Sequence, residues 1–73
     1  MANRPNNSLE RLIRLPEVKS RTGLSTSDLY RRVEAGTFPR QIKLGVKAVA
    51  WIETEVQEWI EKTIQAAKEG AQQ

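Results

Sequence analysis

The sequence predicts a small, mainly α-helical domain that carries one β-hairpin. Two helical segments are each followed by a glycine, Gly23 and Gly36, and a short turn joins them. Alternating apolar and polar residues, which are typical of strands, follow over residues 40–52. Apolar residues at helical spacing then recur over residues 54–67. With 73 residues, the chain is long enough for one domain.

The first elements are a short strand and a short helix. Residues 11–15 favour an edge strand, and Pro16 is suited to the first position of a helix. The helix is expected to end at Arg21 or Thr22. Gly23 then supplies the left-handed residue that commonly follows a helix.

The second helix is expected over residues 26–35, with Ser25 as its N-cap. The Ser25 hydroxyl can accept a free backbone N–H of the first turn, and Asp28, three residues later, resembles the acid of a capping box. Leu29 and Val33 stand four residues apart and are expected to face the core. Asp28 is also expected to pair with Arg32, four residues on.

A hairpin with its turn at Gly45-Val46 and a final helix complete the domain. Thr54 is expected to open that helix with Gln57 in a capping box, and Gly70 to end it. Phe38 is expected to cap the core, and Trp51 and Trp59 fit the core better than they fit base stacking.

Two helices joined by a glycine-containing turn and followed by a hairpin describe a winged helix-turn-helix. We expect a disordered N-terminal arm over residues 1–8, the winged helix-turn-helix domain over 9–67 and a mobile tail over 68–73. In this fold the second helix enters a DNA groove and the hairpin is the wing.

Composition excludes several other functions. The chain has no cysteine and no histidine, which removes thiol chemistry and the commonest general base and metal ligands. We therefore expect no enzyme, catalytic residue, metal, cofactor or small-molecule substrate. No apolar run is long enough to span a bilayer, so we expect a cytoplasmic protein with no membrane partner, associated with the nucleoid when bound to DNA.

Charge is unevenly distributed along the chain. Residues 1–50 carry ten cations and four anions, or +6, whereas residues 51–73 carry two cations and five anions, or −3. A basic body and an acidic last helix suggest that one face meets a polyanion while the other faces away. The alternative is an ordinary solvated surface.

Double-stranded DNA is the partner that this pattern favours. Short side chains at the start of the second helix allow close approach to the major groove, and Arg31 is suited to a bidentate contact with guanine. Each candidate also has a structural role to consider, such as capping, an ion pair, edge packing or protection of the hairpin edge. The candidate DNA-binding residues are Ser25, Thr26, Ser27, Tyr30, Arg31, Arg32, Arg40, Lys43 and Lys47.

The segments "LIRLPEV", "TGLSTSDLYRRVEAGTFPRQIKLG" and "AVAWIETEVQEWI" together resemble the AlpA family of prophage regulatory proteins, which are relatives of the excisionase and MerR-type winged helix domains. The resemblance covers about two thirds of the chain, and it implies a bacterial or prophage transcription factor that binds DNA near integrase or excision genes. It maps four residues to the recognition helix and two to the wing: Ser25, Ser27, Tyr30 and Arg31, then Lys43 and Lys47. Val46 departs from the basic residue or glycine that the family often has there.

We therefore expect a sequence-specific transcriptional regulator of prophage or integrative-element genes. Two copies or repeated sites would be needed for tight binding, because a single module buries little surface. One alternative is an excisionase-like architectural factor that bends an attachment site. Another is a protein-interaction adaptor that uses the last helix.

Overall fold

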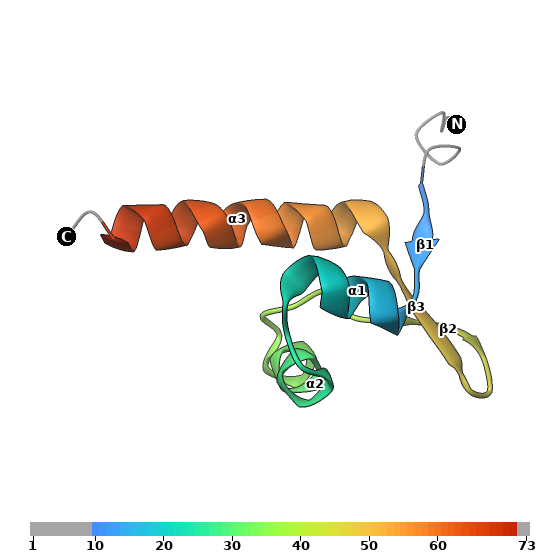
Figure 1. Cartoon of the computed structure of the whole chain (residues 1–73). Helices are drawn as coiled ribbons and strands as arrows, with labels where there is room; N and C mark the ends of the chain where they lie inside the picture. The colour runs from blue at the N-terminus through green and yellow to red at the C-terminus, as the bar shows by residue number, and fades with distance from the viewer. Residues whose placement is uncertain (1–9, 72–73) are drawn as a thin grey trace.

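A computed structural model describes residues 10–71 of the chain. The expected arm over residues 1–8 lies outside this range, as do residues 72–73 of the expected tail. The elements follow in the order β1 (Leu12–Ile13), α1 (Leu15–Thr22), α2 (Thr26–Ala35), β2 (Ile42–Gly45), β3 (Ala48–Ile52) and α3 (Glu53–Ala71). In Figure 1, α1 lies between α3 on one side and α2 on the other, and the β2–β3 hairpin projects beyond them. The mainly helical fold with a hairpin wing is confirmed.

The three strands form one antiparallel sheet in the order β1-β3-β2. Ile13 of β1 pairs with Trp51, while Gly45 of β2 pairs with Ala48. The hairpin turn is therefore Val46-Lys47, not the expected Gly45-Val46. The pairing register shifts between Lys43 and Gly45, and a glycine within a strand is typical of such irregularities. Gly45 therefore remains paired within the sheet, and the turn lies one residue later than expected.

Local chemistry sets the ends of α1 and α2 as predicted. Gly23 has a φ of 76° and its N–H donates to the carbonyl of Lys19 at 2.8 Å. Gly36 has a φ of 79° after α2, and Ser25 Oγ accepts the N–H of Asp28 at 3.1 Å. These contacts satisfy backbone groups that a helix end leaves free. The turn therefore fixes where α2 begins.

A single cluster of apolar side chains joins all three helices to the sheet. Trp51 is fully buried, and its indole N–H donates to the carbonyl of Pro39 at 2.9 Å. Trp59 is half-buried; its ring packs edge-on against Phe38 at 4.9 Å between centroids, and its N–H donates to the carbonyl of Thr37 at 2.7 Å. Both rings are thus engaged with the protein. The cluster consists of Ile13, Val18, Leu29, Val33, Phe38, Trp51 and Val56.

Helix α3 begins and ends differently from the expectation. No loop separates it from β3, and the Glu53 N–H donates to the carbonyl of Arg11, just before β1, at 2.8 Å. Thr54 does not form the capping box: its hydroxyl donates to Glu10 at 3.0 Å, and Gln57 donates to Glu61. The helix also continues past Gly70 to its end at Ala71.

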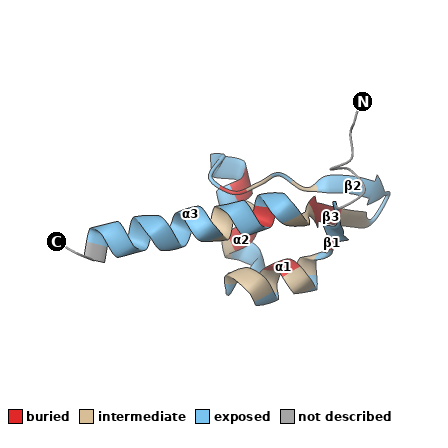
Figure 2. Ribbon diagram, turned by 90° about the horizontal axis from the view of Figure 1, so that it is seen from above, coloured by how far each residue is buried: buried red, intermediate tan, exposed pale blue. Residues whose placement is uncertain are grey.

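Only the first half of α3 packs on the domain. Val56 is buried and Ile60 is half-buried, whereas every residue from 61 to 70 is exposed, as Figure 2 shows. Among the helices of residues 10–71, none has both the length and the apolar character needed to cross a bilayer.

Candidate nucleic-acid interface

The outward side of α2 is free of the rest of the domain. Leu29 and Val33 are buried, which turns the opposite side of the helix outward as their spacing predicted. Neither α1 nor α3 covers this side, and Figure 1 shows α2 at the edge of the molecule away from α3. The exposed residues of α2 and its N-cap are Ser25, Thr26, Ser27, Arg31, Arg32, Glu34 and Ala35.

Asp28 pairs with Arg31 and not with Arg32, so the predicted ion pair is wrong. Arg31 Nη1 lies 2.6 Å from Asp28 Oδ1. The hydrogen bond from Arg31, followed by the one involving Ser25, holds the pKa of Asp28 below its usual value. The Arg31 side chain nevertheless keeps 72% of its surface exposed, so water and salt screen the pair and Arg31 can exchange it for another acceptor.

Arg32 instead contacts the Trp59 ring, which explains why Asp28 pairs with Arg31. Its guanidinium carbon lies 5.9 Å from the centroid of the Trp59 ring, within the range of a cation–π interaction. Because Trp59 belongs to α3, this contact draws Arg32 toward the flank of α2 nearest that helix. Arg32 remains exposed, so its charge still lies at the edge of the α2 surface.

Tyr30 combines a packed ring with a free hydroxyl. The half-buried ring lies 6.1 Å from Trp51 between centroids, at an interplanar angle of 58°. Within residues 10–71 the hydroxyl forms no hydrogen bond, and it is not among the buried polar atoms without a partner, so it reaches solvent. Packing therefore fixes the ring while the hydroxyl is available to an external acceptor.

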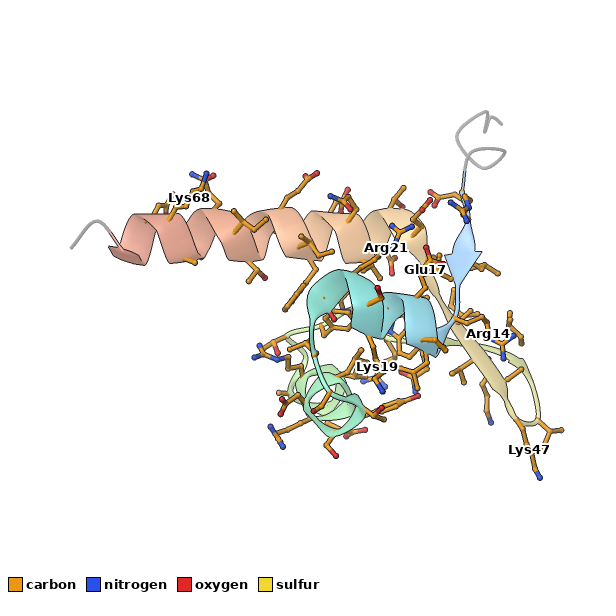
Figure 3. All side chains as sticks on the ribbon, viewed as in Figure 1. Arg14, Glu17, Lys19, Arg21, Lys47 and Lys68 are labelled. Carbon is orange, nitrogen blue, oxygen red and sulfur yellow. The ribbon has the colours of Figure 1, made fainter. Side chains whose placement is uncertain are left out.

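The hairpin supplies a second group of exposed cations. Arg40 precedes β2, Lys43 lies on it, and Lys47 is in the turn. Figure 3 shows Lys47 at the tip of the hairpin, pointing away from α3. The ion pairs formed among residues 10–71 include none of these three cations. Val46, beside Lys47, is 92% exposed, so the tip is part apolar and part basic.

Comparison with known proteins now identifies the family. A sequence model described as "Prophage CP4-57 regulatory protein (AlpA)" matches residues 11–64. The chain belongs to the AlpA family. The match spans β1 through the first part of α3, so it contains every candidate DNA-binding residue. It confirms the family resemblance predicted from the sequence.

Two relatives of this AlpA family member cover most of its length. One, "DNA-binding transcriptional activator AlpA" of Escherichia coli (strain K12), is 42% identical over 62 residues, covering 75% of this chain and 87% of the relative. The other, "Uncharacterized protein ORF88" of Enterobacteria phage P4, is 42% identical over 66 residues, covering 90% of this chain and 75% of the relative.

The structure adds two cations that the sequence analysis did not single out. Arg14 is the N-cap residue of α1, and its Nε donates to the carbonyl of Val49 at 2.9 Å, which ties its exposed side chain to the hairpin. Lys19 points from α1 toward the side that holds α2 (Figure 3). Residue spacing alone could not place either one, because their positions depend on how α1 packs on β3.

Other cations of this AlpA family member are held within the domain. Arg21 donates to Glu17 at 2.5 Å and to Glu53 at 2.8 Å, and Arg11 lies 3.1 Å from Glu53. The hydrogen bond to Glu17, then the one to Glu53, raises the pKa of Arg21 above its usual value. Figure 3 shows Glu17 and Arg21 on the side of α1 that faces α3. Arg11 and Arg21 therefore link α1 and the residue before β1 to α3, on the side away from α2.

Proposed function

We propose that this AlpA family protein is a sequence-specific, DNA-binding regulator of transcription of prophage or integrative-element genes. One observation carries the proposal: the free side of α2 and the basic hairpin tip both face away from the acidic α3. A relative that is 42% identical bears the name of a DNA-binding transcriptional activator, which supports the same function. Binding of this kind would associate the protein with the nucleoid.

In the proposed complex, the N-terminal end of α2 enters the major groove. Ser25, Thr26 and Ser27 are short and exposed, so they allow the backbone to approach the bases. Their hydroxyls can bind phosphates or several different bases, which makes them weak determinants of sequence. Ser25 keeps its capping bond to Asp28 while it does so, because that bond uses Oγ as an acceptor and leaves its proton free to donate.

Arg31 is the proposed determinant of sequence. Its guanidinium can present two parallel N–H groups to the O6 and N7 atoms of guanine, a contact worth about 1–3 kcal/mol of discrimination. Reaching the base means leaving Asp28, and this ion pair is exposed and screened. The contact with guanine forms in a groove with less water, so it is favoured over the pair that it replaces.

The hairpin and the flanks of α2 are proposed to hold the DNA backbone. Lys43 and Lys47 are exposed on the wing, and Arg40 lies at its base. Arg32 and the Tyr30 hydroxyl would reach phosphates beside the groove. Such contacts set the position of α2 on the duplex without reading its sequence.

Selection of binding sites from random duplexes would test the proposal. The wild type is expected to enrich one short motif, and Arg31→Ala is expected to relax selection at one guanine within it. Arg11→Ala removes an arginine that is tied to Glu53 on the far side of the domain, so it is the matched control and should enrich the unchanged motif. The proposal is wrong if the wild type enriches no motif, or if both variants select as the wild type does.

A further inference from the structure

A groove lies between α3 and the loop that leads from α2 into β2. Figure 2 shows this loop passing along one side of α3, with α1 on the other side. The groove has a volume of about 640 Å³, which is within the range of protein sites that bind small molecules. Its walls are residues 36–42 and one face of α3, which presents Glu55, Glu58, Trp59 and Lys62. Residues 36–42 follow the C-terminal end of α2, so the groove lies away from the N-terminal end that is proposed to enter DNA.

The floor of the groove is apolar. Ile42 of β2 pairs with Ala50, which stands two residues before Ile52 in β3, so the two isoleucines lie on the same face of the sheet. Both line the groove, where Ile42 is 37% exposed and Ile52 is half-buried. An aliphatic side chain of a partner would therefore lose contact with water by packing here.

The groove also contains an acceptor that lacks a donor. Among residues 10–71, Gln41 alone has a buried side-chain polar atom, Oε1, without a hydrogen-bond partner. Such an atom lowers stability until a donor reaches it. Gln41 lines the groove, and its terminal amide turns about a soft torsion, so a donor seated in the groove can draw Oε1 toward itself.

Two carboxylates line the same groove without an ion pair. Glu55 and Glu58 are both exposed and stand three residues apart on α3, so they share one face of the helix. Arg40 and Lys62 also line the groove. In the part of the chain that the structure describes, however, no ion pair or hydrogen bond joins either carboxylate to a side chain. Both carboxylates are therefore available to an external donor.

We propose that the groove binds an arginine, beside an aliphatic residue, in an extended segment of a partner protein. A guanidinium carries five N–H donors in a planar fork, enough to reach Glu55, Glu58 and Gln41 Oε1 together. A lysine ammonium is a compact, strongly hydrated charge with three donors, so it would satisfy these acceptors less well. The neighbouring aliphatic side chain packs on Ile42 and Ile52. The site makes no use of α2, so the protein could hold this partner and DNA at the same time.

A nuclear magnetic resonance titration tests the site with a defined probe. The probe is a blocked peptide, Gly-Ser-Ile-Arg-Val-Ser-Gly, and its control replaces the arginine with citrulline, which has nearly the same shape but no charge. In the isotope-labelled wild type, the arginine peptide is expected to shift two groups of signals in a saturable way: the side-chain amide of Gln41 and the indole N–H of Trp59. The citrulline peptide should bind about tenfold more weakly, because it loses the charge-assisted hydrogen bonds.

Matched variants of α3 decide where the peptide binds. Glu55→Gln with Glu58→Gln should weaken binding of the arginine peptide about tenfold and spare the citrulline peptide. Glu61→Gln with Glu69→Gln removes the same charge from α3 outside the groove, so it should leave both affinities unchanged. Gln41→Met keeps the length of the side chain but removes the acceptor, and it should also weaken binding of the arginine peptide.

The proposal is wrong if the wild type binds neither peptide or binds both equally, or if the two double variants weaken binding to the same extent. In the last case the peptide would be responding to the overall charge of α3. None of these titrations contains DNA. Their failure would therefore overturn this site alone and leave the proposed function in place.

Discussion

The Lys47→Ala variant tests the electrostatic role of the wing. Lys47 lies at the hairpin tip, is exposed and forms no ion pair within residues 10–71. Its truncation should therefore leave the fold intact. If Lys47 neutralises a phosphate, the variant must bind every duplex more weakly and must respond less steeply to salt.

The structure sets the size of the expected effect. Four exposed cations of the proposed surface are assigned to phosphates: Arg32, Arg40, Lys43 and Lys47. Four phosphate contacts predict a slope of log K against log salt of about −3.6, since each contributes about −0.9. Raising the salt fourfold should then weaken wild-type binding about 150-fold. Without Lys47 the slope should be about −2.7 and the loss about 40-fold.

Fluorescence anisotropy with a single half-site duplex, over a range of salt concentrations, measures these slopes. Lys62→Ala removes the same charge from α3, which is proposed to face away from DNA, and should keep the wild-type slope. A wild-type slope near zero would refute the electrostatic reasoning. Equal slopes for the Lys47 and Lys62 variants would show that the wing does not meet the backbone.

Three further variants test the fold and the site. Ser25→Ala should lower the free energy of unfolding in urea by about 1 kcal/mol through loss of the N-cap, whereas Ser25→Asp should keep the cap yet weaken DNA binding, because its carboxylate faces the phosphates. Trp51→Ala should abolish the folded circular dichroism spectrum, because the loss of about 3–5 kcal/mol equals the whole stability of a core this small. Asp28→Asn should bind DNA more tightly at neutral pH, since it removes a negative charge and releases Arg31. Because the pKa of Asp28 is lowered in the fold, its ionised carboxylate stabilises the fold fully above about pH 4, and this stabilisation is lost as the pH falls through the pKa of the folded state. The melting temperature should therefore fall less between neutral and acid pH in Asp28→Asn than in the wild type.

Local chemistry explains why α2 could be predicted from the sequence. Ser25 caps the helix through a neighbour three residues away, and Gly36 adopts a positive φ that disfavours other residues. The inward positions of Leu29 and Val33 follow from helical spacing alone. None of these features needs a contact from a distant part of the chain, so the boundaries of α2 agree with the prediction.

Features that depend on distant contacts could not be predicted in the same way. Asp28 has an arginine three residues on and another four residues on, and the Trp59 ring of α3 draws Arg32 away. The hairpin turn shifts because of the register between β2 and β3. The capping box at Thr54 is replaced because the carbonyl of Arg11 already accepts the first N–H of α3. In each case a partner remote in sequence decides between local alternatives.

Arg21 and Arg31 differ in how many carboxylates they contact and in how far they are exposed. Arg21 donates to two carboxylates, from α1 and α3, and its side chain is only 27% exposed, so it serves the packing of the domain. Arg31 has one carboxylate partner and is 72% exposed. The capping bond to Ser25 is donated by the backbone N–H of Asp28 and does not use the carboxylate, so it persists when Arg31 leaves. In the proposed complex, Arg31 can therefore exchange Asp28 for a base without disturbing the start of α2. Net charge alone would miss this difference, because both arginines count equally in it.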